Sequence, residues 1–71
     1  MIEQLTRRER QILLLICRGM CNKEIARELD ITAKTVEWHI SNILGKLGAA
    51  NRTQAVVVAL EQGLLGPGHR Q

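Results

Sequence analysis

Aromatic residues are nearly absent from the sequence: its 71 residues include one Trp, no Phe and no Tyr, and there is a single Pro. A core must therefore be built from Leu, Ile and Val, which suits a compact helical domain. A chain of this length forms one domain that buries a modest share of its surface, so a deep catalytic cleft is not expected. The composition, 45% hydrophobic and 24% charged, argues against disorder.

Cysteine is scarce, and groupings that bind metals or catalyse reactions are missing. Cys17 and Cys21 stand four residues apart, with no second Cys or His pair to complete a tetrahedral zinc site. No nucleophile is accompanied by a paired base. We therefore expect no metal, no cofactor and no enzyme activity.

Long apolar runs are absent as well. The sequence has no run of about eighteen apolar residues, and no basic start that leads into an apolar stretch and a cleavage site, so we expect neither a membrane span nor a signal peptide. A cytoplasmic protein with reduced thiols is expected. Ten Lys and Arg against seven Asp and Glu give a formal net charge of +3, which favours a polyanionic partner but is weak evidence alone.

What the sequence does contain is a series of helix boundaries. Thr6 with Glu9 forms a capping box that starts a helix at about Arg7, and Gly19 ends that helix near Arg18.

Three further helices are predicted in the same way. Asn22 is a good N-cap for a short helix that ends by Leu29, and Thr32 caps a third helix over about residues 33–47. Asn51 with Gln54 starts a fourth, which runs to about residue 62. The prediction is an all-α, four-helix bundle over residues 1–65, followed by a flexible tail over residues 66–71.

The third helix has two distinct faces. Its apolar residues are spaced four, three and four apart and must face inward: Val36, Ile40, Ile43 and Leu47. The opposite side holds Lys34, Trp38, Ser41 and Gly45, with Glu37 and Asn42 on its margins. A Trp on this outer side is unexpected for a helix that only packs.

The second and third helices form a candidate helix-turn-helix. A short helix, a tight turn and a longer helix with a polar outer face match that motif, whose second member lies in the major groove of DNA. Small helical bundles also use such pairs for packing alone.

Many residues at fixed spacing narrow this choice: residues 5–9 (LTRRE), Gly19, residues 22–26 (NKEIA), Leu29, Ile31, Thr35, Val36, His39, Ile43, residues 46–48 (KLG), Asn51, Arg52, Ala55, Gly63 and Leu64. Together they resemble the DNA-binding domain of the LuxR family of bacterial transcription regulators, over about residues 5 to 64. The resemblance implies sequence-specific binding of double-stranded DNA by a homodimer on pseudo-palindromic sites. It also implies a regulatory domain ahead of this one, although stand-alone copies exist, and RNA polymerase as a further partner.

The resemblance implies that outward positions of the third helix contact base edges, here Glu37, Trp38 and Ser41. These positions coincide with the outer face found from periodicity. Glu37 stands where the family often has Lys, and a carboxylate can accept from cytosine N4. Trp38 can lie against a thymine methyl or donate its indole N–H, and the alternative is packing against the turn.

Phosphate contacts are expected from donors at helix starts and from basic side chains around the third helix. With the family match, the candidates are Asn22, Lys23, Lys34, Thr35, His39, Lys46 and Arg52. The alternatives are that Asn22 only caps, that Lys34 is solvated, that Arg52 supports the fourth helix and that His39 only packs.

The fourth helix is apolar on every side from Ala55 to Leu60, whereas packing on one core needs only a stripe. We expect a dimer contact there, and the resemblance implies it for this helix, through Val57, Val58 and Glu61. The alternative function is a helical interaction or dimerisation module that does not bind DNA.

Overall fold

The computed structural model describes residues 2–64, in which a short 3₁₀ helix, η1 (Ile2–Gln4), precedes four α-helices. These are α1 (Arg7–Cys17), α2 (Asn22–Leu29), α3 (Ala33–Leu47) and α4 (Arg52–Glu61). No strand occurs among the described residues. The predicted all-α, four-helix fold is confirmed, while the flexible tail predicted for residues 66–71 lies outside the described residues.

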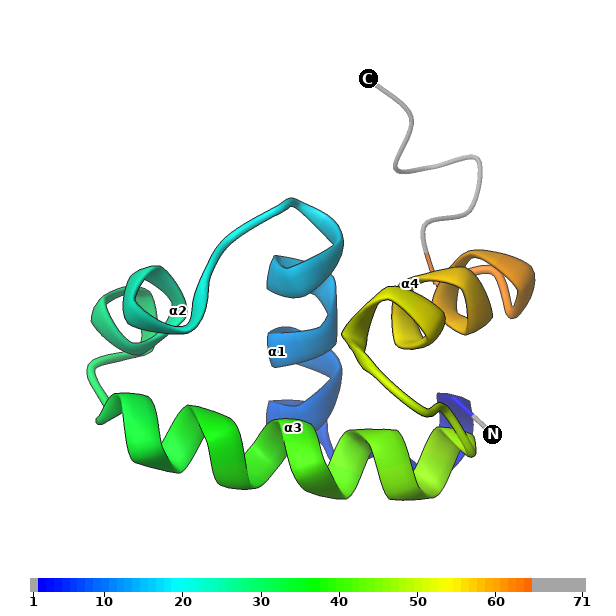
Figure 1. Ribbon diagram of the computed structural model, residues 1–71, viewed down its shortest axis with the longest axis horizontal. Helices are drawn as coiled ribbons and strands as arrows, with labels where there is room; N and C mark the ends of the chain where they lie inside the picture. Colours follow the sequence, from blue (N-terminus) through cyan, green and yellow to red (C-terminus); the bar gives the residue numbers. More distant parts are fainter. Residues whose placement is uncertain (1, 65–71) are drawn as a thin grey trace.

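The arrangement gives α3 one free side. It extends along one edge of the molecule, and α1, α2 and α4 all lie on its other side and contact it (Figure 1). Of those three, α1 lies in the middle and contacts both α2 and α4.

Two helix starts follow the predicted capping chemistry. The Thr6 hydroxyl accepts from the Glu9 backbone N–H at 3.1 Å, and the Glu9 carboxylate accepts from the Thr6 N–H at 2.9 Å. At the start of α3, the Thr32 hydroxyl accepts from the Thr35 N–H at 3.1 Å. These bonds satisfy amides that have no partner within the helix.

The start of α2 differs from the prediction. The N-cap is Cys21, and Asn22 is the first helical residue. The carboxylate of Glu24 accepts from the Cys21 N–H at 2.8 Å. The cap at this end is therefore supplied from inside the helix, and the Asn22 side chain is left for another partner.

The start of α4 differs in a smaller way. Asn51 accepts from the Gln54 N–H at 2.9 Å, as a cap should. The Gln54 side chain accepts instead from the N–H of Ala50, at 2.7 Å, one residue before the cap.

The turn between α2 and α3 is tight because Asp30 adopts the left-handed conformation, with φ 58°. Asp tolerates this region better than most residues, since its short polar side chain can bond locally. Gly48 closes α3 in the same conformation, with φ 66°. A left-handed residue thus ends α2 at Asp30 and α3 at Gly48.

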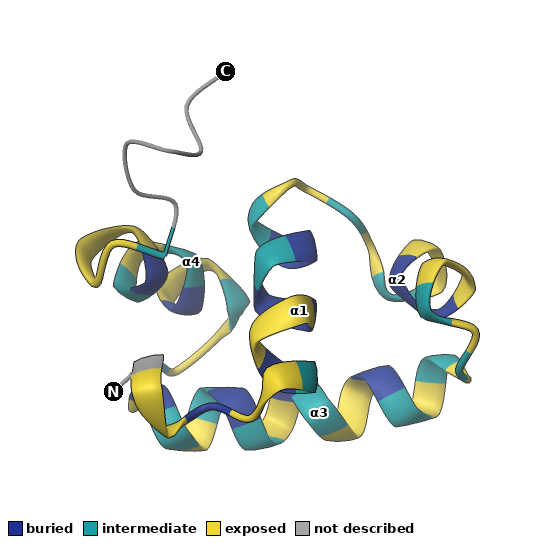
Figure 2. Ribbon diagram, turned by 180° about the vertical axis from the view of Figure 1, so that it is seen from behind, coloured by how far each residue is buried: buried dark blue, intermediate teal, exposed yellow. Residues whose placement is uncertain are grey.

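The core is aliphatic and centres on the face of α3 that the periodicity predicted. Val36 and Ile43 are fully buried, and Ile40 and Leu47 are nearly so. They pack with buried residues of every other α-helix, among them Ile12, Leu13, Ile25, Ala55 and Ala59. Figure 2 shows how buried and exposed residues alternate along α3. The inward stripe therefore fixes the rotation of α3 about its own axis.

We predict that Val36→Asp unfolds the domain. A carboxylate at this fully buried position has neither water nor a partner, and the cost should exceed about 3 kcal/mol, a large share of a small domain's stability. Circular dichroism should show loss of helix. The matched control is Ser41→Asp on the exposed side of α3, which should change the free energy of unfolding by about 0.5 kcal/mol at most. A folded Val36→Asp protein would mean that the two faces are assigned the wrong way round.

Candidate nucleic-acid interface

The solvent side of α3 carries the three side chains predicted to read bases. Glu37, Trp38 and Ser41 are all exposed, and so are Lys34 and Gly45 along the same side. Because the other α-helices lie behind α3, nothing within the described residues covers this side (Figure 1). It forms one accessible surface.

Trp38 is 62% exposed, so the structure does not place it in a packing contact with the turn. Its ring meets His39 edge-on, with centroids 5.1 Å apart and an angle of 65° between the planes. A large aromatic side chain this exposed contributes little to the core. It is available for contact with another molecule.

Two of the predicted phosphate contacts, Asn22 and Arg52, bond to each other. The Arg52 guanidinium donates to the Asn22 side-chain oxygen at 2.7 Å and to the Met20 carbonyl at 2.9 Å. The predicted alternative role of Asn22 as a cap is wrong, while support by Arg52 is present: this side chain joins the start of α4 to the start of α2. Asn22 and Arg52 also line a hollow of about 310 Å³ together with Glu37 and Ser41. The phosphate candidates and the base-reading candidates thus share one surface.

The remaining phosphate candidates differ in accessibility. Lys23 and Lys34 are exposed, while Thr35 and His39 are half-buried. The Thr35 hydroxyl lies 2.9 Å from that of Thr32, which holds its side chain at the start of α3. Nδ1 of His39 is buried and has no hydrogen-bond partner among the described residues. Three of these candidates therefore lie on α3 and one lies near the start of α2, and none of the four forms an ion pair within residues 2–64.

Lys46 is the exception, because it forms an ion pair that the sequence did not reveal. Its ammonium lies 2.8 Å from the Glu9 carboxylate, which is 4% exposed, so the C-terminal turn of α3 is joined to the first turn of α1. Burial raises the pKa of Glu9. The hydrogen bonds from Lys46 and from the Thr6 N–H, together with the charge of Lys46, lower this pKa by more than burial raises it. The net result is a lowered pKa. Glu9 is thus ionised, and it caps the start of α1 while it pairs with Lys46 of α3.

Sequence reasoning identified Glu9 only as a capping residue and Lys46 only as a phosphate contact. The two stand 37 residues apart, so no local spacing joins them. The one signal was a carboxylate, Glu9, between two basic residues, Arg8 and Arg10, in the first turn of a predicted helix.

The candidate dimer face of α4 is partly exposed. Val57 is 46% and Leu60 is 53% exposed, and Glu61 is exposed as well. Val58 is half-buried and packs against the core. Leu60 was not among the predicted contacts, although it lies three residues from Val57 on the same side of the helix. Two large aliphatic side chains thus face solvent side by side.

Within residues 2–64, no helix has both the length and the apolar character needed to cross a membrane.

Residues 3–59 match the family model described as "Bacterial regulatory proteins, luxR family". The chain is 54% identical over 63 residues to the response regulator protein VraR of Staphylococcus aureus, which covers 89% of this chain and 30% of that protein. VraR of Staphylococcus epidermidis matches with the same values. The chain therefore spans about 30% of the length of these curated relatives.

Two solved structures share the fold and much of the sequence. The transcription factor GerE superposes with a TM-score of 0.79 at 45% identity, over 84% of this chain and 90% of that one. The response regulator ChrA of a haem-sensing two-component system gives a TM-score of 0.81 at 40% identity, over 84% of this chain and 30% of that one.

We predict that Glu9→Gln lowers stability at neutral pH by about 1 to 2 kcal/mol, because it removes the charge that faces the half-exposed Lys46 ammonium. A Gln can still accept from the Thr6 N–H, so the capping geometry is kept. Since the folded-state pKa of Glu9 is lowered, its contribution is present above the ordinary pKa of glutamic acid and is lost as the pH falls through the lowered value. Glu9→Gln should therefore flatten the pH dependence of urea unfolding below about pH 5.

The matched control for this prediction is Glu24→Gln. Glu24 also accepts from the backbone of its N-cap residue, but it is exposed and has no ion pair within residues 2–64. Glu24→Gln should change the pH dependence of urea unfolding in acid less than Glu9→Gln does. The account of the ion pair is wrong if Glu9→Gln and the parent lose stability identically with acid.

Proposed function

Because the chain belongs to the luxR family of bacterial regulatory proteins, we propose that it binds double-stranded DNA sequence-specifically and thereby regulates transcription, with α3 in the major groove. The observation that carries this proposal is the free side of α3, where an exposed Trp38 and polar neighbours serve no packing role. The major groove is about 12 Å wide and admits an α-helix. α2 and the tight turn at Asp30 would hold α3 against it.

Each base-reading candidate has a distinct chemistry. When it is ionised, the Glu37 carboxylate accepts hydrogen bonds but cannot donate them. It therefore suits the N4 amino group of cytosine and repels phosphates. The Trp38 ring can lie against a thymine methyl, or its indole N–H can donate to a base acceptor. The Ser41 hydroxyl can donate or accept. Together they would select a short run of base pairs in each half-site.

The phosphate candidates would position the domain without reading sequence. Asn22 and Lys23 lie at the start of α2, where backbone N–H groups and the helix dipole favour an anion. Lys34, Thr35 and His39 follow along α3, and the hydrogen bond from Arg52 holds Asn22 in the hollow that Glu37 and Ser41 also line. The Lys46 ammonium has three donors, and Glu9 uses one of them. It can bind a phosphate while it keeps its ion pair.

Dimerisation through α4 completes the proposal. The exposed apolar side chains of Val57 and Leu60 favour a protein contact, and Val58 and Glu61 border them. A two-fold dimer would place two copies of α3 on half-sites about one helical turn apart. The dimer contact also accounts for the exposed apolar side chains of α4. Without it, these side chains would favour a protein-interaction module that does not bind DNA.

The relatives suggest how the domain is controlled. The chain matches 30% of VraR, which is described as a response regulator. We propose that the chain acts as the effector part of a longer cytoplasmic polypeptide with a regulatory domain. RNA polymerase would be its partner at promoters.

We predict that Trp38→Ala reduces sequence discrimination more than stability. The experiment first selects preferred duplexes from a random pool with the parent protein. The ratio of specific to non-specific affinity should then fall in Trp38→Ala by about 1 to 3 kcal/mol, while the free energy of unfolding changes by about 0.5 kcal/mol or less. Trp38 is not a base reader if the variant is strongly destabilised and keeps the same preferred sequence.

The matched control is Lys34→Ala, four residues earlier on the same exposed side. It should weaken binding to all duplexes alike and reduce the slope of log K against log salt by about one, because one phosphate is no longer neutralised. If duplex affinity in the parent does not depend on salt at all, the domain is not a DNA-binding module.

We predict that Val57→Glu weakens binding to a duplex with two half-sites and leaves binding to a single half-site unchanged. Val57 is a sharper position than Val58, because Val58 also packs against the core and its substitution would perturb the fold. Gln4→Glu, an equal charge change on η1, is the control. Unchanged paired-site affinity in Val57→Glu would show that this face of α4 is not the dimer contact.

A further inference from the structure

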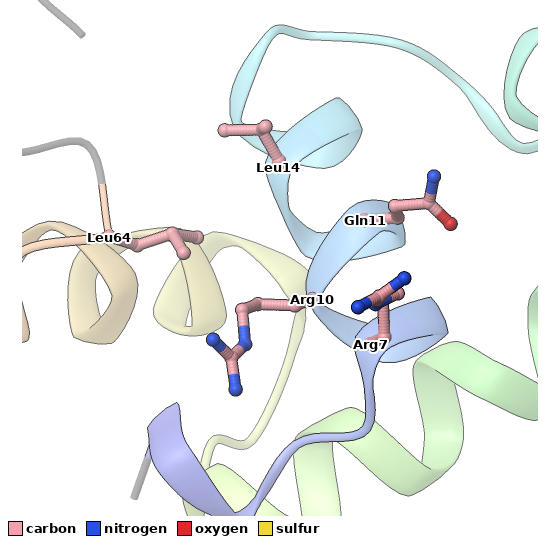
Figure 3. A pocket seen from close by; sticks show the side chains of 5 residues that line it. All are labelled: Arg7, Arg10, Gln11, Leu14 and Leu64. Atoms are coloured by element: carbon pink, nitrogen blue, oxygen red, sulfur yellow. The ribbon is translucent and has the colours of Figure 1, made fainter. Parts of the chain in front are cut away.

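A hollow of about 470 Å³ lies between α1 and Leu64, three residues beyond the end of α4 (Figure 3). We call it the α1 groove, defined by its lining residues Arg7, Arg10, Gln11, Leu14 and Leu64. The side chains of Leu14, Leu64 and Arg10 point into the same space (Figure 3). None of the lining residues comes from α3, so the groove stays accessible when α3 contacts DNA.

The exposed charges of α1 around this groove all have one sign. Arg7 and Arg10 are exposed, and neither forms an ion pair within residues 2–64. Glu9, the one carboxylate of α1, is buried against Lys46 and does not face the groove. Glu3 interacts electrostatically with Arg10 but leaves Arg7 uncompensated. The groove is therefore an apolar floor with a positive rim.

These arginines do not serve the stability of α1 itself. The N-terminus of a helix carries a partial positive charge, so cations in its first turns are unfavourable. Arg7 and Arg10 therefore leave a positive rim on the groove that also contains Leu14 and Leu64. Such a site favours a ligand that offers carboxylates next to apolar side chains.

We propose that the α1 groove docks an acidic amphipathic helix of a separate partner protein while the domain is bound to DNA. Arg7 and Arg10 would pair with carboxylates of that helix, and Leu14 with Leu64 would receive one of its apolar side chains. A DNA backbone needs only the cations and gains nothing from the apolar floor, which is why the geometry favours a protein ligand. Docking on the DNA-bound domain rests on the proposed function of α3, whereas the peptide binding of the groove itself does not.

The test uses a fluorescein-labelled peptide of about 14 residues, with Leu at helical spacing on one side and Glu and Asp elsewhere. Fluorescence anisotropy should show binding to the parent protein that weakens with salt. Arg7→Gln and Arg10→Gln should each weaken the binding about fivefold, and Leu14→Gln about tenfold. Circular dichroism checks that each variant is folded. If Leu14→Gln does not fold, Arg10→Gln still tests the proposal, because Arg10 is exposed.

The matched control is Arg27→Gln, which removes an equally exposed arginine from α2 and should leave peptide affinity unchanged. A peptide with Lys in place of Glu and Asp should not bind, and one with Ser in place of Leu should bind at least tenfold more weakly. Duplex affinity, measured in parallel, should fall no more in Arg10→Gln than in Arg27→Gln.

Three results would overturn the proposal. The first is equal peptide binding by the parent, Arg10→Gln and Leu14→Gln. The second is a loss of duplex affinity in Arg10→Gln with no peptide binding by the parent, which would make the arginines a DNA contact. The third is concentration-dependent self-association that Leu14→Gln abolishes, again with no peptide binding, which would make a second copy the occupant.

Discussion

Everything that α3 presents to solvent depends on the four aliphatic residues that it buries. Val36, Ile40, Ile43 and Leu47 recur at helical spacing, and the other three α-helices close over them. Burying this stripe fixes how α3 is rotated about its own axis. A single set of side chains is therefore left facing solvent. Trp38 and its neighbours are exposed for that reason alone. The candidate functional surface is thus produced by packing on the opposite side of the same helix.

Two long-range polar contacts complete what packing begins. Glu9 and Lys46 join the first turn of α1 to the last turn of α3, and Arg52 joins the start of α4 to Asn22 at the start of α2. Aliphatic contacts tolerate small rotations and slides, whereas an ion pair or a guanidinium hydrogen bond requires a definite geometry. We infer that these contacts hold the helix-turn-helix at a fixed distance from the rest of the domain. Asn22 and Lys46 would then serve both the fold and the phosphate contacts.

Most of the fold could be predicted because its signals are local. Capping at Thr6, Thr32 and Asn51 is encoded within three residues, and the stripe of α3 repeats within each turn. The start of α2 was misplaced by one residue, since Asn22 is a better cap by type than Cys21. A carboxylate at Glu24 outweighed that preference.

The candidate site could be predicted only in part. The side of α3 that faces solvent follows from periodicity, and the resemblance to the LuxR family singled out Glu37, Trp38 and Ser41 on it as the base-reading candidates. The partners of Lys46 and Arg52 lie 37 and 30 residues away, and no spacing rule reaches that far. The α1 groove escaped prediction for the same reason, because Leu64 meets α1 only in the folded chain.

The central claim is that the free side of α3 is the surface that contacts DNA. The most direct measurement is an NMR titration of the ¹⁵N-labelled domain with its selected duplex, followed through the backbone amides and the single indole N–H. The account predicts that the largest shifts fall on Lys34, Trp38 and Ser41 and on the indole of Trp38, with Gln11 and Leu14 of α1 little changed. Largest shifts on the outer side of α1, with α3 unaffected, would contradict it.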